Sequence, residues 1–301
     1  MPTWLCTGGT VLATRDRVLP VERLLPGAAL PALEGGALVV ASVGRIRLSM
    51  TELAAHPALW PVRLAAGALA DGVPAADTMV LPHQMLAVPG FPPMAAHWLV
   101  DGVALQQGAP TAPLDVYILE LDGDGTPASG YCLRDTAAPN ARPDEHALRA
   151  VRAHLARRAG LVPGVLLGSI DAIGVTRLEG WADDGSGHPV AVELVVDGVV
   201  LPPLLADRHR DDLAAAGFGD GRRGFLVSLS PPLDLRRRHL VRVCRALDGA
   251  DLPGSPVLLD SAPGLAPLLD ALPPGAALIG AVAAAARAVA ARLSGALPAR
   301  L

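Results

Sequence analysis

The sequence predicts a mainly β protein, and three observations support that fold class. Short apolar runs of 3–6 residues recur along most of the chain. The 32 Gly and 29 Pro residues of the 301-residue chain repeatedly separate these runs. Long helical patterns are confined to residues 143–159 and 276–293. We therefore expect two β units joined by a helix and followed by a helical tail.

Composition excludes several functional classes. With 51% hydrophobic residues, 18% charged residues and a net charge of −4, the chain resembles globular rather than disordered proteins. All 25 positive residues are Arg, which excludes lysine-dependent chemistry. Aromatic residues make up 3%, too few for a base-stacking surface, and the mild acidity argues against a nucleic-acid partner. No uncharged apolar run reaches the roughly 20 residues of a transmembrane helix.

Cysteine usage predicts neither a disulfide framework nor a zinc site, because Cys6, Cys132 and Cys244 are far apart and odd in number. Cys132 and Cys244 lie in strand-like surroundings and are expected in the core. We expect no metal and no cofactor. Residues 1–17 lack the basic stretch and apolar core of a signal peptide, so a cytoplasmic location is the default expectation, with signal-free secretion as the alternative.

The first β unit is expected to span residues 1–142. Its apolar runs are bounded by turn pairs such as Pro26-Gly27 and Asp71-Gly72. The expected strands are 11–14, 37–40, 62–64, 78–81 and 116–121. This spacing of short strands is typical of an all-β unit.

Residues 143–167 are expected to form a helical linker, with a helix over 143–159. Pro143 fits a first helical position, and the charges at the two ends complement the helix dipole. Gly160 and Pro163 end the helix. The apolar face is expected to carry Leu148, Val151 and Leu155, and the solvated face Arg149, Arg152 and His154.

A second β unit is expected over residues 168–260, most simply a β-sandwich. The pair Asp197-Gly198 between two apolar runs is a strong hairpin signal. The expected strands are 176–182, 190–196, 199–201, 225–229, 239–246 and 257–259.

The densest polar cluster of the chain is Asp207–Asp212 followed by the Gly-rich run 217–224. A functional interpretation is a calcium or sugar site, since both need carboxylates and a sugar site also uses Arg. A structural interpretation, which we favour, has Asp212 capping a short helix over 213–216 that ends at Gly217. The Asp183-Asp184-Gly185 turn has the same two interpretations.

The tail, residues 261–301, contains an Ala-rich helical pattern whose only charges are Arg287 and Arg292. Its uncharged run of 11 residues is too short to span a bilayer. We expect this helix to pack on its own chain or on a second copy, which would make a homo-oligomer. Binding to a membrane surface is the alternative.

Three stretches of the first unit together resemble the Hint fold of hedgehog autoprocessing domains and inteins, and most closely its bacterial hedgehog/intein members. The likeness covers about residues 4–142. It rests on the order and spacing of Cys6-Thr7-Gly8-Gly9-Thr10, residues 18–27, His56-Pro57, Trp60-Pro61-Val62-Arg63, Leu81–Leu86, His97–Gly102, residues 116–122 and Asn140.

The resemblance implies self-cleavage: a Cys thiol attacks the preceding carbonyl and converts an amide into a thioester. In the family, a Ser or Thr and a His three residues later supply a hydrogen-bond donor and a proton. Here those two positions hold Leu81 and Gln84, and Gln cannot deliver a proton near neutral pH. His83 is adjacent but would point to the opposite face of an extended segment.

The nucleophile position also departs from the family pattern. Counting back from Gly9-Thr10 places Leu5 where the nucleophile belongs, so Cys6 is one residue out of register and Thr7 is a distant substitute. Five residues precede Cys6, which leaves almost no cargo to release. Asn140, the only Asn, follows Pro139 rather than the His of an intein ending.

We therefore expect a Hint domain with lost or weak autoprocessing that acts as a binding or scaffolding protein. The candidate site is Cys6, Thr7, His83 and Gln84. One alternative is an active self-cleaving protein that uses Cys6. For His56, His83 and His97, hydrogen bonding in turns or the core is expected rather than metal ligation.

The second unit resembles a poorly characterised β-sandwich module that accompanies bacterial glycosyltransferases and Hint proteins. The matching stretches are Gly180-Trp181-Ala182, residues 192–198, 206–213, 217–225 and 252–256. This likeness implies a fold and no established activity. A carbohydrate-binding accessory protein, with a glycan partner on this unit, is the further alternative.

Overall fold

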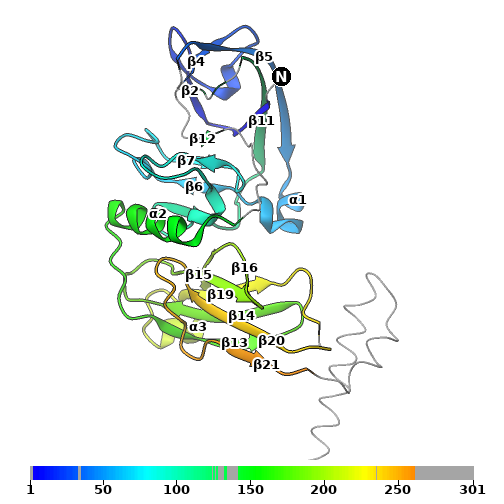
Figure 1. Ribbon diagram of the computed structural model, residues 1–301, viewed down its shortest axis with the longest axis vertical. Helices are drawn as coiled ribbons and strands as arrows, with labels where there is room; N and C mark the ends of the chain where they lie inside the picture. Colours follow the sequence, from blue (N-terminus) through cyan, green and yellow to red (C-terminus); the bar gives the residue numbers. More distant parts are fainter. Residues whose placement is uncertain are drawn as a thin grey trace, which may run out of the picture.

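The computed structural model describes residues 3–32, 35–123, 125, 127, 132–133, 142–234 and 236–261. It is mostly β, as the sequence predicted. Two β units follow one another along the long axis of the molecule, and helix α2 (Glu145–Arg158) lies between them (Figure 1). The predicted tail helix at 276–293 and Asn140 lie outside the described residues.

The first unit consists of small antiparallel sheets. The largest has the strand order β1 (Thr3–Thr7), β11 (Leu114–Asp122), β5 (Ala37–Leu48) and β4 (Ala29–Pro31). The others are β10 (Leu105–Gln107), β6 (Val62–Leu64) and β7 (Thr78–Val80); β12 (Cys132–Leu133), β8 (Met85–Leu86) and β9 (Met94–Ala95); and β2 (Val11–Ala13) with β3 (Val18–Pro20). Short helices complete the unit: α1 (Met50–Ala55) and the 3₁₀ turns η1 (Val21–Arg23), η2 (Pro57–Leu59) and η3 (Ala96–Leu99).

Strand β5 is much longer than the predicted 37–40. Its first residues alternate between exposed and buried, but from residue 41 onward its side chains are half-buried or exposed. That second half therefore carries no apolar alternation, and backbone pairing with β11 keeps it extended. Helix α1 was not predicted either, although Ser49 and Glu52 at its start have the sequence signature of a capping box.

Helix α2 begins two residues later than predicted. Asp144 is its N-cap and accepts a hydrogen bond from the Ala147 N–H at 2.9 Å, so Pro143 precedes the cap. The three predicted apolar residues of its inner face, Leu148, Val151 and Leu155, are buried.

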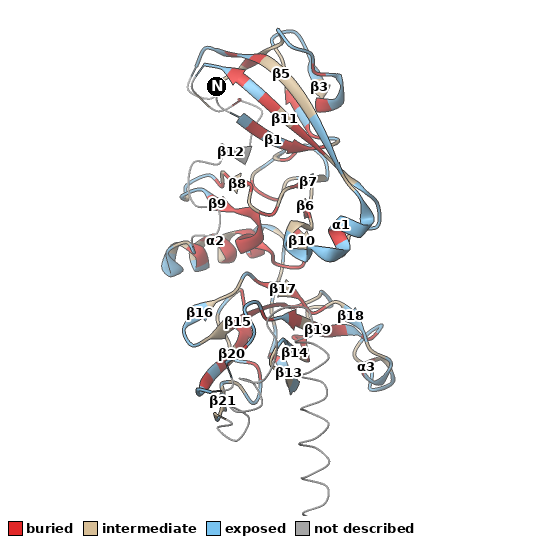
Figure 2. Cartoon of the chain, turned by 90° about the vertical axis from the view of Figure 1, so that its right-hand side faces the viewer, coloured by how far each residue is buried: buried red, intermediate tan, exposed pale blue. Residues whose placement is uncertain are grey.

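The placement of Arg152 on a solvated face was wrong, because this side chain is 2% exposed. Its Nε donates to the Trp98 carbonyl at 2.9 Å, and Nη1 donates to the Ala246 carbonyl at 2.7 Å. Its Nη2 lies 3.2 Å from the Glu193 carboxylate. Trp98 belongs to the first unit and the other two partners to the second, so α2 contacts both units through Arg152, and it lies between them (Figure 2).

The second unit contains two antiparallel sheets. One has the order β13 (Leu167–Ile173), β14 (Arg177–Asp183), β19 (Arg222–Ser228) and β18 (Arg208–His209). The other has the order β16 (Val199–Val200), β15 (Ala191–Val196), β20 (His239–Arg245) and β21 (Val257–Leu259), with β17 (Leu204–Leu205) also paired to β15. Side chains from both sheets, such as Phe225 and Leu194, share one hydrophobic core. Asp197 and Gly198 form the predicted turn, with φ of 51° and 82°.

The two units also meet through apolar and backbone contacts. The core of the first unit extends to Ala191, Leu205 and Ala246 of the second. At Gly102 (φ +84°), a Cβ would lie 2.2 Å from the Pro189 carbonyl oxygen, so the two backbones approach closely and only Gly fits. In the described part of the chain, no helix is both long enough and apolar enough to cross a membrane.

Candidate functional site

Strand β1 places the Cys6 side chain in the core of the first unit. Side chains alternate along a strand, and here Leu5 is 37% exposed whereas Cys6 is 5% exposed. Cys6 lies opposite Tyr117 in the ladder between β1 and β11. The sequence left residues 5 and 6 as candidates for the nucleophile position, and residue 6 is the one whose side chain faces inward.

The surroundings of Cys6 disfavour the thiolate. Burial, together with the smaller effect of the nearby Glu22 carboxylate, raises the pKa of the thiol to about 12. That carboxylate accepts a hydrogen bond from the Gly9 N–H, which fixes it beside the turn after β1. Because the thiolate is the nucleophile, almost none of the reactive form exists near neutral pH.

The Thr7 hydroxyl is committed to structure. Thr7 is fully buried, and its Oγ1 donates to the Met79 carbonyl at 2.5 Å. Thr10 Oγ1 donates in turn to the Thr7 carbonyl at 2.7 Å. These bonds tie the end of β1 to β7, two residues before Leu81. The Met79 carbonyl could not be found from sequence, because a backbone acceptor has no residue signature.

Residues 81–84 form a turn rather than the extended segment assumed from the sequence. The Gln84 N–H donates to the Leu81 carbonyl at 3.0 Å and closes the turn. Gln84 is buried, and its carbonyl accepts from the Ala96 N–H at 2.9 Å. The bond from Thr7 to Met79 thus joins β1 to β7, the strand that precedes this turn. The two turn positions hold the alkyl side chain of Leu81 and the amide side chain of Gln84.

The histidines near the turn serve packing and hydrogen bonding. His97 is 3% exposed, and its Nδ1 lies 2.6 Å from the Pro82 carbonyl, which makes Nδ1–H the donor. Burial lowers the pKa of His97 to about 4, so the ring is neutral at physiological pH. The ring of His83 meets it edge-on, with 5.0 Å between centroids. His56 ends helix α1.

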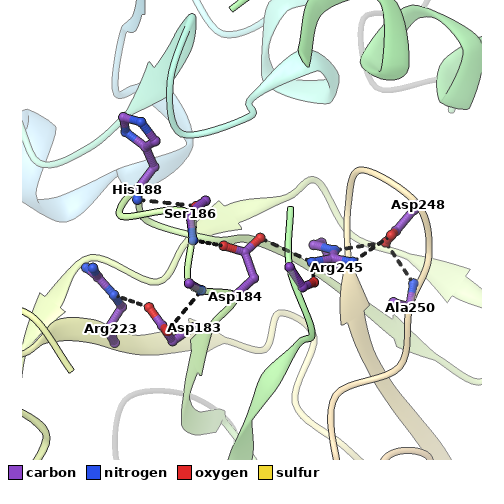
Figure 3. Close-up of polar contacts among 10 residues, drawn as sticks. Asp183, Asp184, Ser186, His188, Arg223, Arg245, Asp248 and Ala250 are labelled. Atoms are coloured by element: carbon purple, nitrogen blue, oxygen red, sulfur yellow. Dashed lines mark hydrogen bonds and ion pairs between the residues drawn. The ribbon is translucent and has the colours of Figure 1, made fainter. Parts of the chain in front are cut away.

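The acidic turn of the second unit is neutralised by arginines (Figure 3). Asp183 pairs with Arg223 at 2.5 Å, and Asp184 pairs with Arg245 at 3.1 Å. Arg245 also pairs with Asp248 at 2.7 Å. The described residues include no group of three or more His, Cys, Asp or Glu side chains arranged to hold a metal ion.

The prediction that Asp212 caps the short helix was wrong. Helix α3 (Asp211–Ala215) has Arg210 at its N-cap, without a side-chain cap. Asp212 lies in the first turn and pairs with Arg210 at 2.6 Å, which removes its carboxylate from a capping position. Gly217, with φ of 87°, follows the helix end as expected.

Cysteines 132 and 244 have different outcomes. Cys244 is 1% exposed, as predicted for a core residue, and burial raises the pKa of its thiol to about 11. Cys132 belongs to β12, but its side chain lies outside the described part of the structure.

These features define an all-β domain with an inward-facing cysteine on its first strand, tied through β7 to a four-residue turn. Residues 6–123 match the family model of the Hint domain, and the chain therefore contains a Hint domain. The match begins at Cys6 and ends just after β11. The searches of curated proteins and of solved structures each found no match.

Proposed function

We propose that this Hint domain has lost self-cleavage and serves as a non-catalytic binding or scaffolding domain. The observation that carries the proposal is the turn closed by the hydrogen bond from the Gln84 N–H to the Leu81 carbonyl. Neither the Leu81 nor the Gln84 side chain can supply a proton. The β units packed around α2 support a scaffold role, because they form one continuous body.

The chemistry of self-cleavage explains why this turn matters. The Cys6 sulfur would have to add to the carbonyl carbon of Leu5, the C–N bond would break, and the Cys6 nitrogen would take a proton as it leaves. An acid is needed for that proton, and a donor is needed for the oxyanion that forms on the carbonyl. Leu81 has no donor, and the Cys6 thiol is held neutral by burial. Catalytic groups of this kind act as a unit, so losing one of them lowers the rate of the reaction by several powers of ten.

The test is a fusion with a folded reporter joined upstream of residue 1, followed by intact mass over several days with and without hydroxylamine or dithiothreitol. We expect the fusion to stay intact. The matched control is Cys6→Ala, which should behave identically. Release of the reporter by the unaltered chain but not by Cys6→Ala would overturn the proposal and support the self-cleaving alternative.

A double variant, Leu81→Thr with Gln84→His, tests the assignment of the turn. It restores the hydroxyl and the imidazole at the two positions. We expect thiol-induced release of the reporter to rise above that of the unaltered chain, and to vanish when Cys6→Ala is added. An inert but folded double variant would show that loss of these two side chains is not what limits cleavage.

A further inference from the structure

A groove of about 520 Å³ lies between the two β units. Its first wall comes from β6, β7 and β10 and the loop 108–113 of the Hint domain. Its second wall comes from Pro189, Leu205, Asp207 and Arg222 of the second unit. Pockets that bind small molecules have volumes of this size and occur preferentially between domains. Arg152, which does not line the groove, bonds to both of the units that form its walls.

Of the described residues that line this groove, Asp207 is the one that is acidic. It is half-buried, and its Oδ2 lies 3.7 Å from the position that a Cβ on Gly108 would take, so the carboxylate faces the opposite wall. Among the described residues, it accepts a hydrogen bond only from its own backbone N–H. Burial raises the pKa of this carboxyl, against the opposing effect of Arg222 and Arg208.

The charges around the groove disfavour an ionic ligand. Arg63 is neutralised by Asp77 and also donates to Gln106 Oε1 at 3.0 Å. A cationic ligand at Asp207 would meet the two arginines that already act on that carboxyl, and an anionic ligand would meet the carboxylate itself. An uncharged ligand that carries hydroxyl groups satisfies the acceptor without either repulsion.

Other parts of the lining suit the same chemistry. Gln107 Nε2 donates to the Trp60 carbonyl at 2.7 Å, which fixes the amide at the groove wall. Met79 is 40% exposed and, with Pro110 and Pro189, provides apolar surface for C–H groups. A sugar combines C–H faces with hydroxyl donors. From this combination, we propose that the groove between the Hint domain and the second unit binds an uncharged oligosaccharide.

This site goes beyond the proposed function and does not depend on it, because Cys6, Leu81 and Gln84 do not line the groove. It lies at Asp207 and the inter-unit wall, whereas the sequence suggested a sugar site on the second unit alone. Asp211 and Asp212, in helix α3, do not line it.

The test is a glycan array probed with the full chain, followed by calorimetric titration of the best uncharged oligosaccharide. We expect binding that weakens at least tenfold in Asp207→Asn, which keeps the side-chain shape but removes the charged acceptor. Ala112→Trp, which fills the groove from the exposed loop 108–113, should also abolish binding. Asp211→Asn, at the first residue of α3, is the matched control and should bind normally, since this side chain is fully exposed and does not line the groove.

Thermal melts of each variant separate loss of binding from loss of folding. If Asp207→Asn fails to fold, Ala112→Trp decides the outcome. The proposal is overturned if no uncharged glycan binds, if only charged glycans or peptides bind, or if Ala112→Trp binds as well as the unaltered chain. Reporter cleavage in the fusion experiment would leave this result unaffected, so the two proposals fail independently.

Discussion

At the scale of single residues, burial decides the chemistry of the site. A thiol at the surface would titrate near 8.5, but the Cys6 side chain faces the core and carries a pKa of about 12. Thr7 has its hydroxyl bound to a carbonyl, and His97 is kept neutral. The residue types present near the turn therefore do not determine reactivity; their surroundings do.

The raised pKa of Cys6 predicts a loss of stability at high pH. In the unfolded chain the thiol ionises near its ordinary pKa, whereas in the folded chain it stays neutral, so the folded state binds more protons above pH 9. The contribution of Cys6 is complete below pH 9 and falls by about 1.4 kcal/mol per pH unit above it. Urea unfolding at pH 8 and pH 10.5 should show the advantage of the unaltered chain over Cys6→Ala shrinking by about 2 kcal/mol. Parallel pH profiles for the two proteins would contradict this.

The Thr7 hydroxyl predicts a difference between two substitutions of similar size. Thr7→Val removes the donor to the Met79 carbonyl and leaves a buried position without its hydrogen bond, which should cost about 1–3 kcal/mol in the free energy of unfolding. Thr7→Ser keeps the hydroxyl and loses a methyl group, so it should cost about 1 kcal/mol. Chemical denaturation of both variants measures the difference. Equal losses would show that the hydroxyl is not what holds β1 to β7.

At the scale of elements, the sequence predicted several strands that are short apolar runs between turn residues and missed others, among them β1 and the second half of β5. Strands 62–64 and 116–121 were found because each is a short apolar run bounded by Gly- and Pro-containing turns. The second half of β5 was missed because pairing with β11, a long-range contact, determines its conformation. For α2, the spacing of apolar residues predicted the buried face correctly. It could not show that the second unit also covers Arg152, because that contact is made by residues far away in the sequence.

The N-cap of α2 predicts a measurable loss of stability. Asp144 accepts from the Ala147 N–H in the first turn, so Asp144→Ala should reduce the free energy of unfolding by about 1 kcal/mol. Asp144→Asn retains a capping oxygen and should lose only a few tenths of that value. Guanidinium unfolding monitored by circular dichroism measures both variants. A smaller loss for Ala than for Asn would contradict the assignment of the cap.

At the scale of the whole molecule, Arg152 links the two β units that the sequence analysis treated as separate. Its three hydrogen-bonding groups contact η3, β15 and the residue after β20, and the packing of Gly102 against Pro189 adds a second junction. The candidate site could be anticipated from the motif around Cys6 and from the turn at Leu81–Gln84, because both are local. The groove at Asp207 could not, since its two walls come from segments about 100 residues apart.

This junction predicts that the two β units unfold together. Arg152→Met leaves the Glu193 carboxylate buried without its partner, and breaking such a pair costs about 3–5 kcal/mol. We expect calorimetry to show one transition for the unaltered chain and two for Arg152→Met, because the units then lose their main polar link. Arg157→Met, at an exposed position of the last turn of the same helix, is the control and should keep one transition. Adding Glu193→Leu to Arg152→Met should recover part of the lost stability, since no buried charge remains. If Arg152→Met still unfolds in a single transition at an unchanged temperature, Arg152 does not couple the two units.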